Sequence, residues 1–525
     1  MSARQRRRKE NRRRHHSQTS PTRRRLIAAG GVTAGATLAF SGVAQAAPFT
    51  VGSLDDTTGG DCATPTNTDC TLRQAIIDAN ANAGADTIVF RSGLTGAITL
   101  TADPEPVTEA LTVQGPGASQ ITVDGVYNYR TFEINPGTAS DPVSISGLTL
   151  TAGYTSVNGG AIYNDDANLT ISNAVISDSY AYGSVAGGGV FSLIGPVTID
   201  SSTISGNYAG GPIDFGAGGG VYSYEGELTV TNSTVTGNEA AVPGDGYGGG
   251  INASNGDITI DRSTIADNDA RDGGGIYATY GDVTVTNSTI TGNNAVTDDG
   301  GGVWVSNGAL TVIGSTVTDN YASYVGGGLQ SYNAGNNTVQ NSIVSGNTAV
   351  DFPDTADLGS SGEPFDVAFS LIGVPADHVN ETVPGSNLTG LDPQLGPLQS
   401  NGGPTETMAP ATTSPVVNKG SAFGLTTDQR GLTRPVAFPG VPNSTAAGAD
   451  GSDMGAVELQ LPSPAPTPAG PTTTGQRAAA IKKCKKKHKQ ALKRKRSRDA
   501  LTKPVKKKLN KKFKKCKRKA RQLPV

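Results

Sequence analysis

A short pattern that recurs every 25 to 31 residues constrains the fold of this chain more than any other feature. It reads Asn-Ser-Thr-Val at Asn232, and related slots follow one another at spacings of 28, 31, 30, 25, 27 and 27 residues. The slots begin at Asn173, Ser201, Asn232, Arg262, Asn287, Gly314 and Asn341. Repeats of this length indicate a solenoid in which every repeat forms one coil.

An alternating run of β-branched and polar residues begins four positions before each slot. The runs start at Leu169, Val197, Leu228, Ile258, Val283 and Leu310. Alternation predicts short strands that turn every second side chain inward. One such strand cannot bury its inner face, but stacked coils about 4.8 Å apart can. The sequence therefore predicts an all-β chain whose body is a right-handed parallel β-helix.

A column of asparagines is expected on one corner of this solenoid. Six residues after each slot start stand Asn207, Asn238, Asn268, Asn293, Asn320 and Asn347, with Ser179 in that place in the first repeat. Stacked amides can bond to the next coil, and Asn tolerates a left-handed backbone at turns. We expect these residues to form a structural ladder, followed by glycine runs that bend the chain.

Length varies at one corner only, since 4 to 10 residues separate the Asn from the next glycine run. Variation confined to one corner is typical of the binding face of a solenoid. Tyr208, Tyr321 and Tyr324 lie in these loops and are candidate ligand-binding residues.

A second candidate set stands just after the glycine runs. It consists of Tyr163, Phe191, Tyr222, Tyr277 and Trp304, with Asn252 and Gln330 in the equivalent places of two other repeats. Alternation places this column outward. Its rings either stack on sugar rings or form a structural ladder that covers the sheet, and the sequence leaves both open.

The distribution of charge divides the chain into an acidic body and a basic tail. Residues 1–25 hold 11 of the 43 Lys and Arg and residues 477–525 hold 24, with one acidic residue in each segment. Residues 26–476 therefore combine 8 basic with 43 acidic residues. We expect the tail to bind an anionic cell-envelope polymer or a phospholipid surface, or else to lie on the acidic body, and nucleic acid is an unfavoured partner. Pro504 divides the tail into two helical arms that a Cys484–Cys516 disulfide could join, with free thiols as the alternative.

The N-terminal segment predicts export. Arg23 and Arg24 precede a Gly/Ala-rich apolar stretch and the cleavage pattern Ala44-Gln45-Ala46. This order resembles a twin-arginine signal peptide, so we expect an exported protein of the bacterial cell surface or medium. The mature chain contains no segment suited to span a membrane.

A short helix is expected near the N-terminal end of the solenoid. Thr71 and Gln74 have capping-box spacing, and Leu72, Ala75, Ile76 and Ala79 share one helical face. We expect this helix to close the first coil, held by a Cys62–Cys70 disulfide.

Two segments that flank the repeats resemble known bacterial surface domains. Residues 70–76, 78–80 and 85–90 resemble the N-terminal CSLREA domain, with Thr71 for Ser and Gln74 for Glu. Residues 390–393, 401–404, 414–418, 428–431 and 453–458 resemble the choice-of-anchor Q domain. The resemblance implies a bacterial surface β-helix akin to polymorphic outer-membrane proteins, and it says little about the ligand. Arg430 and Arg434 are expected to pair with Asp428, Asp453 or Glu458 in a C-terminal β-cap, or else to signal anchoring.

The expected organisation has six parts: a signal peptide (1–46), a CSLREA-like cap (47–100), a parallel β-helix (101–390), a choice-of-anchor-Q-like cap (391–459), a Pro/Thr linker (460–476) and a Lys/Arg-rich tail (477–525). The predicted function is adhesin-like or glycan-binding, through the variable loop face.

The alternative function is a secreted polysaccharide lyase or glycoside hydrolase, and the chain is more readily interpreted as a binding protein than as an enzyme. Candidate catalytic carboxylates are Asp272, Asp298 and Asp299, with Asp267 and Asp269 beside them. The competing interpretation makes them turn residues that bond backbone amides. No cofactor motif is present, and calcium in the acidic turns is the one alternative.

Overall fold

The computed structural model describes residues 48–461, apart from 138–140, 212–214, 243, 334 and 375–377, together with 481–488 and 503–521. The predicted signal peptide with Arg23 and Arg24 and most of the predicted Pro/Thr linker lie outside these residues.

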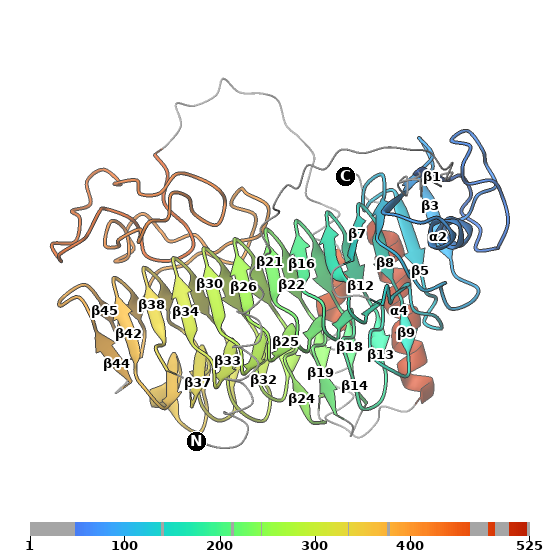
Figure 1. Cartoon of the computed structure of the whole chain (residues 1–525). Coiled ribbons are helices and arrows are strands. Elements are labelled where there is room, and N and C mark those ends of the chain that lie inside the picture. The colour runs from blue at the N-terminus through green and yellow to red at the C-terminus, as the bar shows by residue number, and fades with distance from the viewer. Residues whose placement is uncertain are drawn as a thin grey trace, which may run out of the picture.

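The described body is a parallel β-helix of about ten turns, which confirms the predicted fold class. Every pairing between its named strands is parallel, and the strands build five sheets, here named A to E. Each complete coil passes through sheets A, B and D and returns through sheet C, as the repeated layers in Figure 1 show.

Sheet A contains β1 (Pro48–Val51), β2 (Asp86–Phe90), β4 (Leu111–Gln114), β7 (Pro142–Ser146), β11 (Asn168–Ser172), β16 (Val197–Asp200), β21 (Leu228–Thr231), β26 (Ile258–Asp261), β30 (Val283–Thr286), β34 (Leu310–Ile313), β38 (Thr338–Gln340), β42 (Phe365–Ala368) and β44 (Val379–Glu381). Sheet B contains β3 (Gly96–Thr99), β5 (Ile121–Asp124), β8 (Thr149–Thr151), β12 (Val175–Ser177), β17 (Thr203–Ser205), β22 (Thr234–Thr236), β27 (Thr264–Ala266), β31 (Thr289–Thr291), β35 (Thr316–Thr318), β39 (Ile343–Val344), β43 (Leu371–Ile372) and β45 (Leu388–Thr389).

Sheet C contains β6 (Phe132–Ile134), β10 (Ile162–Asn164), β15 (Val190–Ser192), β20 (Val221–Ser223), β25 (Ile251–Ser254), β29 (Ile276–Thr279), β33 (Val303–Ser306), β37 (Leu329–Tyr332) and β41 (Leu358–Ser361). Sheet D contains β9 (Tyr154–Thr155), β13 (Tyr180–Ala181), β18 (Tyr208–Ala209), β23 (Glu239–Ala240), β28 (Asp269–Ala270), β32 (Asn294–Ala295), β36 (Tyr321–Ala322) and β40 (Thr348–Ala349). Sheet E contains only β14 (Val185–Ala186), β19 (Gly216–Ala217) and β24 (Gly246–Tyr247).

The core is a continuous stack of aliphatic side chains inside the coils. In sheet A, for example, Ile199 pairs in register with Val230 and Val230 with Ile260, and all three are fully buried. In sheet D the buried position is an alanine in every strand from β13 to β40, and Thr155 takes that place in β9. Alternation along each strand thus places like residues above one another, as a period of two requires.

The asparagines line one corner of the solenoid in a continuous column. Each donates from Nδ2 to Oδ1 of the next, at 2.9 Å from Asn207 to Asn238 and 3.0 Å from Asn238 to Asn268. The column ends at Asp357, which accepts from Asn347 at 2.8 Å. The expected left-handed backbone lies elsewhere: the residue before each Asn has a positive φ, such as 57° at Asp267. Glycine stands there before four of the six asparagines and adopts this conformation without a steric cost.

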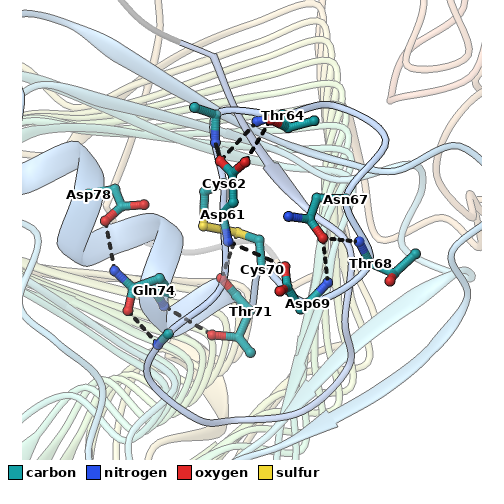
Figure 2. The surroundings of a disulfide bond; sticks show 12 residues. Asp61, Cys62, Thr64, Asn67, Thr68, Asp69, Cys70, Thr71, Gln74 and Asp78 are labelled. Atoms are coloured by element: carbon teal, nitrogen blue, oxygen red, sulfur yellow. Dashed lines mark hydrogen bonds between the residues drawn. A yellow bond between two sulfur atoms is a disulfide. The ribbon is translucent and has the colours of Figure 1, made fainter.

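The N-terminal helix α2 (Leu72–Ala81) contacts β1 and β2 at one end of the solenoid (Figure 1). Thr71 Oγ1 accepts from the Gln74 amide at 3.1 Å, as capping requires. The Gln74 side chain does not complete a capping box, because its Oε1 accepts from the Gly59 amide at 2.6 Å. Figure 2 shows this helix start beside the Cys62–Cys70 disulfide, which ties the preceding loop to the helix.

Residues 391–461 lie along the flank of the later coils and contain only isolated bridges in place of strands (Figure 1). The fully buried Gln429 side chain bonds to Ser263 and Thr289 of two successive coils. Arg434 pairs with Glu458 at 3.0 Å and is also buried. These contacts run across the side of the coils, so a C-terminal β-cap is not confirmed. The physical reason is that this segment lacks alternating runs that could extend the sheets.

The described part of the tail forms two helices, residues 481–488 and α4 (Lys503–Arg521), joined by a Cys484–Cys516 disulfide. Pro504 lies in the first turn of α4, after the helix of residues 481–488. Within the described ranges, no helix combines the length and the apolar character that crossing a bilayer requires.

Candidate functional site

The outward aromatic column lies on sheet C, where it forms a stack of parallel rings. Tyr163 and Phe191 have ring centroids 5.4 Å apart, and Phe191 and Tyr222 repeat that spacing with 3° between the ring planes. Tyr277 and Trp304 stack at 4.3 Å and 1°. Because each ring covers the face of its neighbour, this column covers sheet C and presents mainly ring edges.

The stack is interrupted where the repeat carries an amide. Asn252 lies in register between Tyr222 and Tyr277, and Gln330 follows Trp304. Both amides are almost fully buried, and each has a side-chain oxygen without a hydrogen-bond partner. The five aromatic residues therefore form two short stacks rather than one long stripe.

The three loop tyrosines do not join this column. Tyr208 and Tyr321 lie on sheet D, four pairing steps apart, with Glu239, Asp269 and Asn294 between them. Tyr324 contacts Phe352 edge to face at 4.8 Å in another corner. The eight sequence-predicted ligand residues thus fall into three separate groups.

A surface pocket of about 250 Å³ lies where sheets C and E meet. Its walls combine aromatic and aliphatic side chains with a small number of polar groups: Asn158, Ser184, Val185, Ala186, Phe191, Leu193, Phe215, Tyr222 and Tyr224. Phe215 is 45% exposed and Tyr224 39%, whereas Phe191 is 3% exposed. Phe215 and Tyr224 therefore offer ring surface to a ligand, and Phe191 forms the floor.

Sheet E explains why the pocket occurs at this height of the solenoid. Its strands belong to the long coils, whose corner loops carry the extra residues. Asn158 Oδ1 accepts from the Ala186 amide at 2.9 Å and so fixes the start of this corner. The coil after β24 has a shorter corner loop. Sheet E therefore ends at β24, where Tyr247 forms only an isolated bridge to Asp272 of that next coil.

A charged cluster lies at the end of sheet E, centred on Arg271. Its guanidinium pairs with Asp245 at 2.6 Å and with Asp298 at 2.9 Å, and lies 3.6 Å from Asp272. It also lies 5.9 Å from the ring centroid of Tyr247. One arginine thus links three successive coils at the variable corner.

Burial raises the pKa of two carboxyl groups in the corner loops, those of Asp272 and Asp299. It raises the pKa of Asp272 to about 7, with the charge of Asp298 adding to the effect. Burial likewise raises the pKa of Asp299 to about 6. At neutral pH these two groups lie near their titration points, the condition that a general acid or base needs.

The same carboxyls also serve as turn acids. Asp272 Oδ1 accepts from the Asp299 amide and Asp299 Oδ1 from the Val325 amide, both at 3.2 Å. Asp267 adopts a left-handed turn conformation, and Asp269 accepts from the Asn294 amide group. In the described part of the chain, no group of three or more His, Cys, Asp or Glu is arranged to hold a metal ion. A calcium site remains a prediction that no contact tests.

Sequence reasoning missed Asn158, Tyr224 and the central role of Arg271. Arg271 could have been found from the sequence, because it is the single basic residue among the acidic corner loops. Nothing in the sequence indicated Asn158 and Tyr224, because their place in the pocket depends on how neighbouring coils align.

The comparisons with known proteins agree with this architecture. Residues 134–317 and 250–358 match the family model described as a right-handed β-helix region. No curated protein and no solved structure matches the chain. The matched range excludes the segments that resemble the CSLREA and choice-of-anchor Q domains, so those two assignments remain predictions. The family match and the coordinates together identify a right-handed parallel β-helix repeat protein.

Proposed function

We propose that this protein is an adhesin-like, carbohydrate-binding β-helix, and that it holds a glycan in the pocket at the junction of sheets C and E. The observation that carries the proposal is the wall of Phe215 and Tyr224 over the floor of Phe191. Aromatic rings with a free face stack on the apolar faces of sugars, while Asn158 and Ser184 supply polar groups for hydroxyls. At about 250 Å³ the pocket fits one end or one unit of a longer glycan.

The test is binding of the full chain to a glycan array, followed by titration of the best ligand. The double variant Phe215→Ala/Tyr224→Ala should raise the dissociation constant at least tenfold, and its unfolding midpoint should match that of the parent. Tyr280→Ala is the matched control, because Tyr280 is 60% exposed and lies outside the pocket. The proposal fails if the parent binds no glycan or if the double variant binds as the parent does.

Export to the bacterial surface is the second part of the proposal. It is supported by the twin-arginine pattern at Arg23 and Arg24 and by the resemblance to surface domains on both sides of the repeats. Fractionation of cells that express the full chain or a chain ending at Leu459 tests it. Retention in the cytoplasm contradicts export, and equal release of both forms into the medium contradicts a tail anchor.

A polysaccharide-cleaving activity is a second candidate, favoured by one observation. Asp272 and Asp299 lie on successive coils with pKa values raised to about 7 and 6, so one carboxyl can donate a proton while the other is charged. Asp298 is held by Arg271 and is less suited to this role. Incubation with acidic polysaccharides, with and without calcium, tests the candidate. Product release that Asp272→Asn and Asp299→Asn abolish would establish it.

A further inference from the structure

The basic tail is built as a compact pair of helices around two contacts. The Cys484–Cys516 disulfide joins the helix of residues 481–488 to α4, with Cα atoms 5.9 Å apart. One turn away, the rings of His488 and Phe513 stack at 4.4 Å and 14°. Lys517 lies 5.1 Å from the Phe513 ring centroid and covers this contact. The two helices therefore face each other along one shared side.

The apolar stripe of α4 is used inside this pair. Leu509, Phe513 and Cys516 are partly buried, and Cys484 on the facing helix is 5% exposed. Apart from Lys517, the remaining described side chains of α4 are exposed, and all but Asn510 are basic: Lys511, Lys512, Lys514, Lys515, Arg518 and Lys519. Over residues 509–519, whose side chains the structure describes, the apolar stripe is covered and leaves no free hydrophobic face of the kind by which amphipathic helices enter a lipid interface.

Charge alone would drive the two helices apart. Residues 481–488 include five Lys, α4 includes twelve Lys and Arg, and neither contains an acidic residue. Isolated helices of this length are marginal in water, and the apolar contact between them is small. A disulfide that spans 32 residues stabilises such an arrangement by reducing the conformational freedom of the unfolded chain. The paired state therefore depends on the disulfide and belongs to an oxidising compartment.

The shape and the charge of this surface select an extended anionic ligand. The 19 residues of α4 span about 28 Å at about 1.5 Å per residue, and exposed basic side chains run from Lys511 to Lys519 in its described part. A single small anion would engage only a few of these ammonium groups. A flexible polymer with repeated charges can follow the helix and release its counterions along it. The acidic body would repel the same polymer, so binding is confined to the tail.

We propose that the helix of residues 481–488 and α4 form a disulfide-closed polycation that binds a linear anionic polymer, independently of the glycan pocket on the body. The probe is labelled long-chain inorganic polyphosphate, titrated with the oxidised full chain at 50 and 200 mM salt. Binding at 50 mM salt should weaken by about 10³-fold at 200 mM, as expected for six or more phosphate contacts.

The variant Cys484→Ser/Cys516→Ser tests the role of the paired helices. It keeps every basic residue, yet its dissociation constant for polyphosphate should rise about tenfold at 50 mM salt. Lys511→Gln/Lys515→Gln should also weaken binding and flatten the salt dependence, while Lys419→Gln on the body should change nothing. Absence of binding by the oxidised chain, or equal binding by the serine variant, overturns the proposal.

Vesicles distinguish the polymer from a membrane. Phosphatidylglycerol vesicles offer the same phosphate charge as a flat surface, and we expect them to bind more weakly per phosphate than polyphosphate. Binding to these vesicles without binding to polyphosphate also overturns the proposal. Because the pocket variants Phe215→Ala/Tyr224→Ala leave the tail intact, loss of glycan binding and loss of polyphosphate binding are separate outcomes.

Discussion

Two columns of side chains run through the central coils of this solenoid, and they differ in how strictly they repeat. The asparagine column is unbroken from Asn207 to Asn347, whereas the aromatic column on sheet C changes to an amide at Asn252 and Gln330. Both columns stack coil on coil with the same register. The difference therefore comes from the kind of contact and not from the backbone.

In the asparagine column, every position needs a side chain that both donates and accepts a hydrogen bond. Each buried Asn donates to the next and accepts from the one before, so a residue that cannot do both leaves polar groups unpaired. Stacked rings require only an apolar neighbour and are partly open to solvent. Strict repetition thus marks a buried hydrogen-bonded column, and variation marks the face that is free to acquire a ligand site.

The largest effect should follow from breaking the asparagine column. In Asn268→Asp the new carboxylate cannot donate to Asn293 Oδ1 or to the Val235 carbonyl, and it would be buried beside other oxygens. We expect a loss of about 3–5 kcal/mol in the free energy of unfolding, measured by denaturant titration. Asn168→Asp, at an exposed position of β11, is the matched control and should change it by less than about 0.5 kcal/mol. A small loss at Asn268 would contradict the comparison.

The reverse substitution, Asp272→Asn at the variable corner, should increase the free energy of unfolding, and by less than Asn268→Asp lowers it. The pKa of Asp272 is raised to about 7 from 3.8, so the folded protein binds this proton more tightly than the unfolded chain. The free energy of unfolding therefore falls as pH rises from about 4 to 7 and then levels off. A rise of about three pKa units corresponds to roughly 4 kcal/mol, but Asp272→Asn also loses the attraction to Arg271 at 3.6 Å. The variant should therefore gain about 2 kcal/mol on the parent at pH 8 but little at pH 4.

Asp298→Asn is the control for that pH series. Neutralising Asp298 relieves part of the raised pKa of Asp272 but also breaks the ion pair with Arg271 at 2.9 Å, so we expect a smaller gain at pH 8 than for Asp272→Asn. Equal behaviour of the two variants would show that the burial of Asp272 has no energetic consequence.

The smallest effect is expected in the aromatic column. Trp304→Leu loses the stack on Tyr277 at 4.3 Å and the contact with Tyr332 at 6.4 Å, but it keeps an apolar cover over sheet C. We expect a loss of about 1 kcal/mol in the free energy of unfolding. If this loss equals that of Asn268→Asp, the aromatic column restricts its residues as strictly as the asparagine column does.

Much of the architecture could be predicted because it depends on local periodicity. The inward positions such as Ile199 and Val230, the outward place of Tyr222 and the Asn ladder positions all follow from a period of two within a strand and about 28 residues between coils. The candidate site could be predicted only in outline. Asp272 and Asp299 were recognised as corner acids, but their raised pKa values depend on burial that no spacing reveals.

The sequence by itself determined the coil, its register and the corner that varies. Every coil repeats the same local pattern, and this pattern is sufficient to align the strands of successive coils. Only the tertiary structure decided which residues meet across coils of unequal length. It placed Phe215 beside Tyr224, linked Arg271 to Asp245 and Asp298, and laid residues 391–461 along the flank. The physical reason is that these contacts join loops whose lengths differ, so their partners are set by the alignment of whole coils and not by a repeating pattern.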